Sequence, residues 1–250
     1  MRLIPLLAVG LLAALTPPRQ DPPDAPQDVF AALAQSGIDL DLDRGTVSVP
    51  ATFLILDDWL EYLIVTPQGK AHESLFQTSV RPSLLNAAIL ALGLEPGKRM
   101  RWENRVPQPT ETELAEGVRP VLAVAPTGPQ LFLYAEWTDG DEVYRYRVED
   151  LVLKSNSRTA MDRTGWVFVS APFVPDHPRP DQERREVFGA DRDGNIASLC
   201  FFANETHLLS SPDPDAIHQT IWTANPFLCP DKDTACTLIF SKERLVTPWK

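Results

Sequence analysis

The chain has 250 residues, of which 44% are apolar, and its formal net charge is −11. This length suits one domain, or one domain with a large insertion. The acidic balance makes nucleic acid a poor partner, because a negative surface repels phosphate backbones. The chain contains 24 prolines, a share well above the usual one, which favours strands joined by stiff loops over a helical bundle.

The first residues have the pattern of a secretory signal peptide. Arg2 supplies a short positive region, and the apolar run from Leu3 to Leu15 is too short to span a bilayer. We expect residues 1–16 to be a signal peptide and the protein to be exported to the periplasm or the extracellular space. The alternative is an uncleaved N-terminal anchor in the inner membrane. No stable transmembrane span is expected in the mature chain, and residues 17–27, rich in Pro and Asp, are predicted to be a disordered tether.

Residues 28–250 are predicted to form a single domain with a C-terminal extension. A short helix is expected at residues 28–35, and strands are expected at residues 46–49, 53–56, 61–66 and 70–78. Pro67-Gln68-Gly69 is a turn signal, so the strands on either side of it are predicted to form a hairpin.

The clearest helix is predicted at residues 82–92. Pro82 suits its first turn, and Gly93 suits the left-handed residue just past its end. Between residues 84 and 92 Asn86 is the only polar residue. A helix that is apolar on nearly all sides is expected to lie in the core, with Leu85 and Leu92 buried.

The second half of the chain reads as hairpins joined by Pro-rich loops. Residues 101–120 are predicted to be an exposed connection, and residues 172–185 a loop. Hairpins are expected between residues 121–125 and 131–137 and between 187–191 and 195–202. A turn at residues 138–141 is predicted to lead into a segment at 142–148, and a further strand is expected at 166–169. Together these elements predict an α+β fold of antiparallel hairpins around one buried helix.

Three cysteines lie late in the chain, at positions 200, 229 and 236. Cys229 and Cys236 bracket a short polar loop, and an exported compartment permits disulfides, so we predict a bridge between them. Cys200 lies in an apolar run and is expected to be a buried free thiol. The alternative is three unpaired thiols. No metal site is predicted, since no Cys-x-x-Cys pair is present.

Several segments resemble one known family. They are Glu61-Tyr62-Leu63-Ile64-Val65, Gly69-Lys70-Ala71-His72-Glu73-Ser74-Leu75-Phe76, the helix from Leu85 to Gly93 with Pro96-Gly97, Trp166-Val167-Phe168-Val169-Ser170, and the stretch from Ala190 to Ile196. This set resembles the YdjY-like domain, which is known from exported bacterial proteins, often of the planctomycete type. The resemblance covers roughly residues 47–212. It implies a domain type and export, and it implies no reaction.

The window at residues 70–74 concentrates the polar chemistry. On a strand, Lys70, His72 and Ser74 would share one face and form a binding surface, whereas Glu73 would turn to the apolar face. We expect Glu73 to be a structural carboxylate that holds backbone amides near the start of the helix at 82–92. The functional alternative makes His72 and Glu73 a catalytic acid/base pair or part of a metal site.

Two functions therefore remain open. The first is an exported, non-catalytic module that binds an envelope or extracellular ligand or protein. The second is a metal-dependent or acid/base hydrolase with its site around His72 and Glu73. No nucleophile elbow, phosphate-binding loop or dinucleotide fingerprint is present, so no cofactor is expected.

Overall fold

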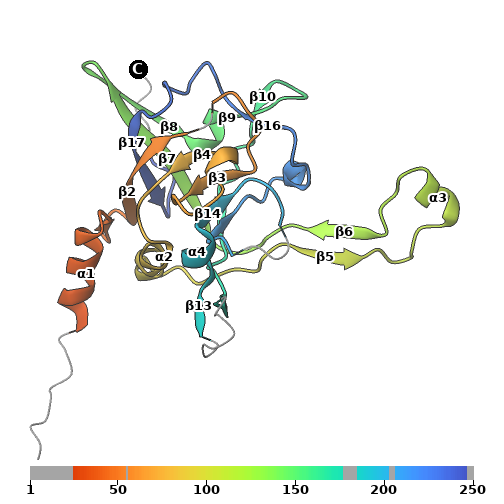
Figure 1. Cartoon of the computed structure of the whole chain (residues 1–250), viewed down its shortest axis with the longest axis horizontal. Helices are drawn as coiled ribbons and strands as arrows, with labels where there is room; N and C mark the ends of the chain where they lie inside the picture. Colours follow the sequence, from red (N-terminus) through yellow and green to blue (C-terminus); the bar gives the residue numbers. More distant parts are fainter. Residues whose placement is uncertain (1–24, 55, 177–184, 203–205, 247–250) are drawn as a thin grey trace, which may run out of the picture.

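The structure is a computed structural model that describes residues 25–54, 56–176, 185–202 and 206–246. The predicted signal segment and most of the predicted tether lie outside these residues. At the centre of the molecule the strands close on themselves (Figure 1). Within the described residues eight strands form this barrel, in the order β2 (Thr46–Phe53), β17 (Ala235–Ser241), β7 (Gln130–Asp139), β11 (Trp166–Phe168), β15 (Leu209–Ser210), β14 (Asn195–Ser198), β3 (Tyr62–Val65) and β4 (Ser74–Gln77), and β4 pairs again with β2.

Two further strands share edges with the barrel strands. β1 (Asp39–Asp41) pairs with the first half of β2, and β8 (Glu142–Arg147) pairs with the second half of β7. Along β2, Val47, Val49 and Phe53 are fully buried, whereas Pro50 between them is exposed. This alternation directs one face of the strand into the barrel. The two strands predicted at residues 46–49 and 53–56 are therefore one strand, which continues through Pro50.

The predicted helix at 82–92 is confirmed as α2 (Pro82–Ala91). Gly93 has a φ of +81°, as its place after the helix requires. Leu85 and Leu92 are buried, as expected, but Leu90 on the other side of the helix is 42% exposed. The helix therefore lies against the outside of the strands with one face covered and does not run through the centre of the core.

The predicted α+β fold class is wrong. The described part of the chain is mostly β-structure closed into a barrel, and its four helices are short: α1 (Ala25–Gln35), α2, α3 (Glu111–Ala115) and α4 (Gly189–Asp193). The apolar strands indicated sheet structure correctly. The prediction failed on strand pairing: turn signals led us to pair strands that are neighbours in sequence, whereas most barrel strands pair with strands far away in sequence. None of the described helices has both the length and the apolar character needed to cross a bilayer.

The predicted hairpins are also wrong. Gly69 does turn the chain, but η1 (Ala71–Glu73), a short 3-10 helix, returns it to the start of β3, so β3 and β4 run parallel. β6 (Val121–Val124) pairs with β5 (Arg101–Asn104) and not with β7. β13 (Glu186–Phe188) pairs with β12 (Phe173–Pro175) and not with β14. The predicted turn at residues 138–141 is confirmed, and β8 pairs with β7 over the tight turn at Gly140.

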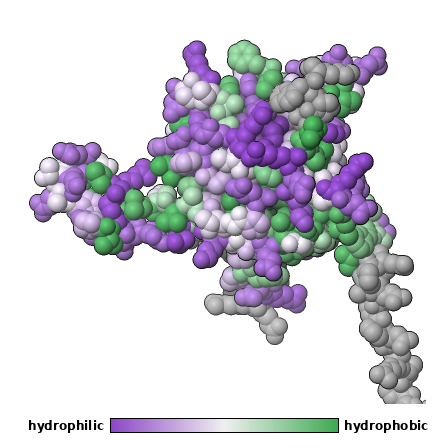
Figure 2. Space-filling model, turned by 180° about the vertical axis from the view of Figure 1, so that it is seen from behind, coloured by the Kyte–Doolittle hydropathy of each residue, from purple (hydrophilic) through white to green (hydrophobic). Residues whose placement is uncertain are grey.

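The β5–β6 ribbon and α3 form an arm that projects from the barrel (Figure 1). Residues 101–120 are exposed along most of their length, as predicted. The tip is ordered by a capping box, in which the Thr110 side chain accepts a hydrogen bond from the Glu113 backbone and the Glu113 carboxylate bonds back to Thr110. Figure 2 shows polar and apolar residues interspersed along this arm.

A small three-stranded sheet lies beside the barrel. It consists of β10 (Thr159–Ala160), β9 (Val152–Lys154) and β16 (Trp222–Ala224), with η2 (Val148–Leu151) and η3 (Pro214–Ile217) nearby in the chain. The buried residues of the barrel and of this sheet form one hydrophobic cluster. Trp166 and Trp222 are its largest fully buried side chains.

The predicted disulfide between Cys229 and Cys236 is wrong, because all three cysteines are free. Cys229 donates its Sγ–H to the carbonyl of Leu151 in η2, whereas Cys236 is fixed in β17 opposite Ala51. The two thiols are thus held by different parts of the fold. Burial raises the pKa of both thiols to about 12. Cys200 is buried and free, as predicted.

Candidate functional site

Three residues of the predicted polar window, Lys70, His72 and Glu73, lie at or near the surface on η1 or just before it. The His72 side chain is 75% exposed and its Nε2 lies 3.9 Å from Glu73 Oε2, while Lys70 Nζ lies 3.9 Å from Glu73 Oε1. Ser74 is buried, but its hydroxyl donates a 2.6 Å hydrogen bond to the Lys70 carbonyl. The window therefore holds a loose surface cluster of three charged or ionisable side chains, with the hydroxyl turned away to the backbone.

The start of α2 is held by Asp191 and not by Glu73, which corrects the role predicted for Glu73. Asp191 Oδ1 accepts a 2.7 Å hydrogen bond from the Ser83 backbone N–H, and its Oδ2 accepts a 2.6 Å bond from Arg81 Nε. A carboxylate at this position satisfies a free amide of the first turn and interacts favourably with the helix dipole. Arg81 occupies the N-cap position and makes no capping bond there. The sequence has no Ser, Thr, Asp or Asn at the N-cap position of this helix. That absence is a signal that a residue distant in sequence, here Asp191, caps the helix.

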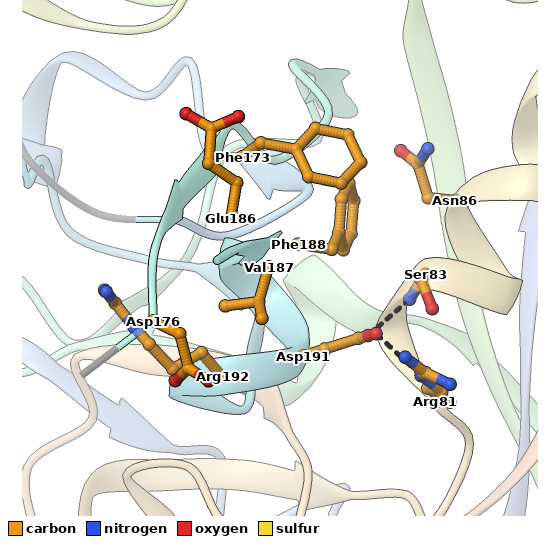
Figure 3. A pocket seen from close by; sticks show the side chains of 10 residues that line it. All are labelled: Arg81, Ser83, Asn86, Phe173, Asp176, Glu186, Val187, Phe188, Asp191 and Arg192. Atoms are coloured by element: carbon orange, nitrogen blue, oxygen red, sulfur yellow. Dashed lines mark hydrogen bonds and ion pairs between the residues drawn. The ribbon is translucent and has the colours of Figure 1, made fainter. Parts of the chain in front are cut away.

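A pocket opens beside this contact, between the first turns of α2, helix α4 and the β12–β13 hairpin (Figure 3). Its volume is about 590 Å³, which is within the usual range for small-ligand sites. It is lined by Arg81, Ser83, Asn86, Phe173, Asp176, Glu186, Val187, Phe188, Asp191 and Arg192. We call it the Phe173 pocket.

One wall of the Phe173 pocket is aromatic. Phe173 and Phe188 are directly opposite each other in the β12–β13 pair, and their rings meet edge to face with centroids 5.7 Å apart. Phe173 is 66% exposed. A phenylalanine left in water on a pocket wall offers apolar area that a ligand would bury on binding.

The opposite wall contains a buried amide oxygen. Asn86, on the second turn of α2, is 8% exposed, and its Oδ1 has no hydrogen-bond partner among the described residues. Figure 3 shows the Asn86 amide and the Phe173 ring on facing sides of the pocket. A buried polar atom left unpaired costs about 1–3 kcal/mol, so a ligand that pairs with this oxygen would recover that free energy.

Both arginines around the pocket are already paired within the protein. Arg81 pairs with Asp191, and Arg192 forms two bonds to Asp193, of 2.6 and 3.0 Å. The hydrogen bond to Asp193 raises the pKa of Arg192, which therefore stays charged. Arg192 Nη1 also donates to the carbonyl of Pro175, which ties α4 to β12. With both arginines engaged and the carboxylates of Asp176 and Glu186 also in the lining, the pocket disfavours an anionic ligand.

Sequence reasoning singled out one part of this site and missed the rest. Asn86 stood out as the lone polar residue of the helix, although no role followed from that. Phe173 and Phe188 lie in and after a segment predicted to be a loop, and no pattern linked them to α2. Asp191 was predicted to end the first strand of a hairpin, at residues 187–191, whereas it lies in α4. The His72 and Glu73 pair does not line the Phe173 pocket.

Two other features limit the chemistry of the described residues. Lys154 is buried against Asp213 and Asp215, with Nζ–Oδ2 distances of 3.2 and 2.8 Å. Burial alone would lower the pKa of Lys154, but the carboxylates of Asp215, Asp213 and Asp162 outweigh it and raise the pKa, so this lysine is not a general base.

No group of three or more His, Cys, Asp or Glu side chains that could hold a metal ion occurs among the described residues.

Comparison with known proteins gives a family and no activity. No curated protein and no solved structure matches the chain. The family model of the YdjY domain matches residues 38–241, which is most of the chain. The match includes the η1 window, helix α2, the β12–β13 hairpin and helix α4. The chain therefore belongs to the YdjY domain family.

Proposed function

We propose that this protein is an exported, non-catalytic binding module whose binding site is the Phe173 pocket. The ligand we infer is a neutral, peptide-like segment that carries an amide group next to an apolar side chain. The observation that carries this proposal is the unpaired, buried amide of Asn86 facing an exposed phenylalanine. Such an arrangement costs stability in the free protein, and ligand binding would recover that cost.

The chemistry of the two walls supports a peptide-like ligand. The Asn86 amide offers an acceptor oxygen and two N–H donors, which match the N–H and C=O groups of a peptide bond. The Phe173 and Phe188 rings provide apolar contact for a neighbouring side chain. The paired arginines leave little free positive charge in the pocket, which disfavours an anionic ligand. The net charge of −11 disfavours nucleic acid in the same way.

The hydrolase alternative would need a hydrogen bond between His72 and Glu73, and the described residues show none. His72 is mostly exposed and lies 3.9 Å from Glu73, beyond hydrogen-bond distance. The nearby Ser74 hydroxyl is bonded to a backbone carbonyl and is buried. A surface pair without an enclosing pocket excludes no water and positions no substrate.

Export is part of the proposal, and it rests on the charge and the apolar run of residues 1–16. We expect the mature protein to begin between Ala14 and Gln20. Mass spectrometry of the protein recovered from the periplasmic or extracellular fraction measures this directly. Intact Met1 on that protein would contradict cleavage and favour the alternative of an N-terminal anchor.

The pocket is tested with N-acetyl-L-phenylalaninamide, a neutral probe with two amides and an apolar ring. We expect saturable binding to the wild-type protein with a dissociation constant of about 1 mM, followed by ligand-observed NMR. Phe173→Ala should weaken binding at least about fivefold, because the ring contact contributes on the order of 1 kcal/mol.

Phe227→Ala is the matched control. Phe227 is 87% exposed and does not line the pocket, so its removal takes away the same side chain elsewhere on the surface. Equal binding to wild type and both variants would contradict the proposed site. If N-acetylglucosamine binds to this pocket and N-acetyl-L-phenylalaninamide does not, the ligand class is a sugar and the peptide-like ligand is wrong.

A further inference from the structure

A second pocket, of about 300 Å³, lies where β7, β8 and η2 meet the chain that follows β17. Four arginines contribute to its lining, Arg145, Arg147, Arg163 and Arg244, together with the phenol rings of Tyr134 and Tyr146. We call it the arginine pocket. It shares no lining residue with the Phe173 pocket.

The arginine pocket carries an excess of positive charge. Three of its arginines are each paired with one carboxylate: Arg145 with Glu136, Arg147 with Glu149, and Arg163 with Asp150. Arg244 packs its guanidinium over the Phe132 ring, 5.3 Å from the centroid, and has no carboxylate partner among the described residues. Four guanidinium groups thus stand against three carboxylates, on a protein whose net charge is −11.

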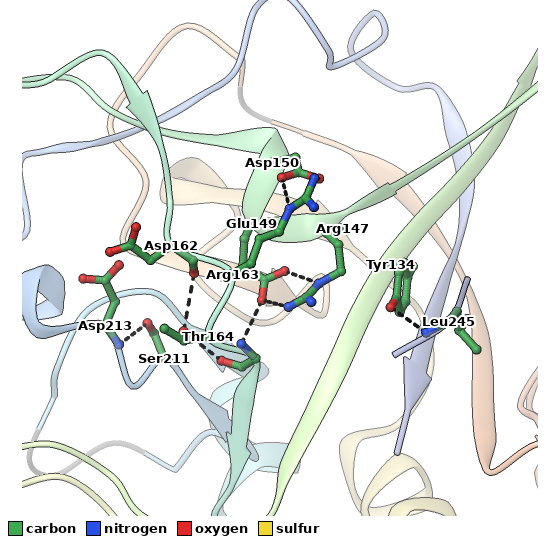
Figure 4. A network of polar contacts seen from close by, with 11 residues as sticks. Tyr134, Arg147, Glu149, Asp150, Asp162, Arg163, Thr164, Ser211, Asp213 and Leu245 are labelled. Atoms are coloured by element: carbon green, nitrogen blue, oxygen red, sulfur yellow. Dashed lines mark hydrogen bonds and ion pairs between the residues drawn. The ribbon is translucent and has the colours of Figure 1, made fainter. Parts of the chain in front are cut away.

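Arg147 is the fixed centre of this cluster. It is 8% exposed, and its guanidinium lies over the rings of Phe132 and Tyr134, at 5.2 and 5.8 Å. It bonds to the fully buried Glu149, whose carboxylate also accepts a 3.0 Å bond from the Gly165 N–H (Figure 4). Guanidinium has five N–H donors, and Glu149 takes two of them. The others have no acceptor among the described residues.

The remaining polar groups add donors and few acceptors. The Tyr134 oxygen accepts a 2.8 Å bond from the Leu245 N–H, so its own proton is still available. The Tyr146 hydroxyl has no hydrogen bond to the described residues. The one carboxylate in the lining is Asp150, and Arg163 engages both of its oxygens, at 2.7 and 2.8 Å. Donors that outnumber acceptors in a positive pocket favour an anionic oxygen ligand.

We propose that the arginine pocket binds a small oxyanion, namely a carboxylate or phosphate group. Arg147 and Arg244 donate to its oxygens, and Tyr146 contributes a hydroxyl at the rim. Arginine suits this role because its planar fork matches the geometry of both anions. This site goes beyond the proposed peptide-like ligand and does not depend on it, since the two pockets are built from different elements.

The test titrates the full-length mature protein with inorganic phosphate and, separately, with acetate, in low-salt buffer. Binding is followed by two-dimensional NMR. We expect one of the two anions to bind with a dissociation constant of about 1–10 mM, and Arg244→Gln to weaken it at least about fivefold. Phe173→Ala should leave anion binding unchanged. Raising the salt concentration should weaken binding, because Arg244 is exposed to solvent.

Arg119→Gln is the control for charge, since Arg119 is an exposed arginine on the arm, far from the pocket in the fold. It removes the same charge and should leave binding unchanged. Preference for phosphate or for acetate would each support the site and identify its anion. Absence of saturable binding to both anions would overturn the proposal, as would an equal loss of affinity in Arg119→Gln and Arg244→Gln.

Discussion

Replacing Gly194 with alanine is expected to lower the free energy of unfolding by about 3–4 kcal/mol. Gly194 follows α4 with a φ of +72°, a conformation that costs an L-residue about 1–2 kcal/mol. An added Cβ would also collide with the Gly69 backbone nitrogen and would lie 2.6 Å from Thr66 Oγ1. Because these contacts are with backbone and with a buried threonine, the overlap can be relieved only by moving two chain segments apart.

Gly140→Ala separates the two contributions. Gly140 has a φ of +57°, in the turn between β7 and β8, and an added Cβ there would meet nothing within 4 Å. Gly140→Ala should therefore lower the free energy of unfolding only by the cost of the left-handed backbone conformation, about 1–2 kcal/mol. Urea unfolding followed by tryptophan fluorescence measures both variants. Equal losses would show that the close approach of Gly194 and Gly69 contributes nothing to stability.

This close approach also explains the polar window at residues 69–74. Thr66 donates its backbone N–H to the Gly194 carbonyl at 2.7 Å, and Lys70 donates its own to Asn195 Oδ1 at 3.3 Å. Gly69 itself has no room for a side chain, since a Cβ would lie 2.5 Å from the Gly194 carbonyl oxygen. The window is therefore a turn held against the start of β14, and it links two segments that are far apart in sequence but adjacent in the barrel.

The sequence allowed local structure to be predicted better than pairing. α2 has its signals at its own ends, namely Pro82 at its start and Gly93 just after it, and both predicted boundaries agree with the structure to within one residue. Alternating or apolar runs correctly marked segments such as β11 as strands. Such a run shows that a strand has a buried face but does not identify the strand beside it. The turn at residues 138–141 was predicted correctly because its signal is local, and it joins β7 to β8.

The candidate site was harder to predict for the same reason. Asn86, Phe173 and Asp191 come from three elements that are brought together by the barrel and by α4 packing against α2. Within the helix, Asn86 stood out only as a break in an apolar run. The strand alternation that directed Glu73 inward did not apply, because residues 71–73 form a 3-10 helix. The resemblance to the YdjY domain was correct and covers nearly the segment that the family model matches.

Asn86→Leu should raise stability and abolish binding of the probe at the same time. Leucine has the same number and branching of side-chain heavy atoms, removes an unpaired buried polar atom and favours the helix more than asparagine does. We expect a gain of about 1 kcal/mol, or a melting temperature higher by about 2–4 °C. The loss of binding follows from the loss of the amide that pairs with the ligand.

Asn195→Leu is the matched control, because Asn195 is equally buried but its amide is bonded to the Lys70 backbone. That variant should be less stable than wild type.

The central claim is that the Phe173 pocket is a binding site, and that the unpaired Asn86 oxygen in its wall lowers the stability of the ligand-free protein. Its most direct test measures the melting temperature and N-acetyl-L-phenylalaninamide binding of Asn86→Leu side by side with wild type. The account predicts a higher melting temperature and no detectable binding. A lower melting temperature, as expected for Asn195→Leu, together with unchanged binding, would show that Asn86 is a structural residue and would contradict the account.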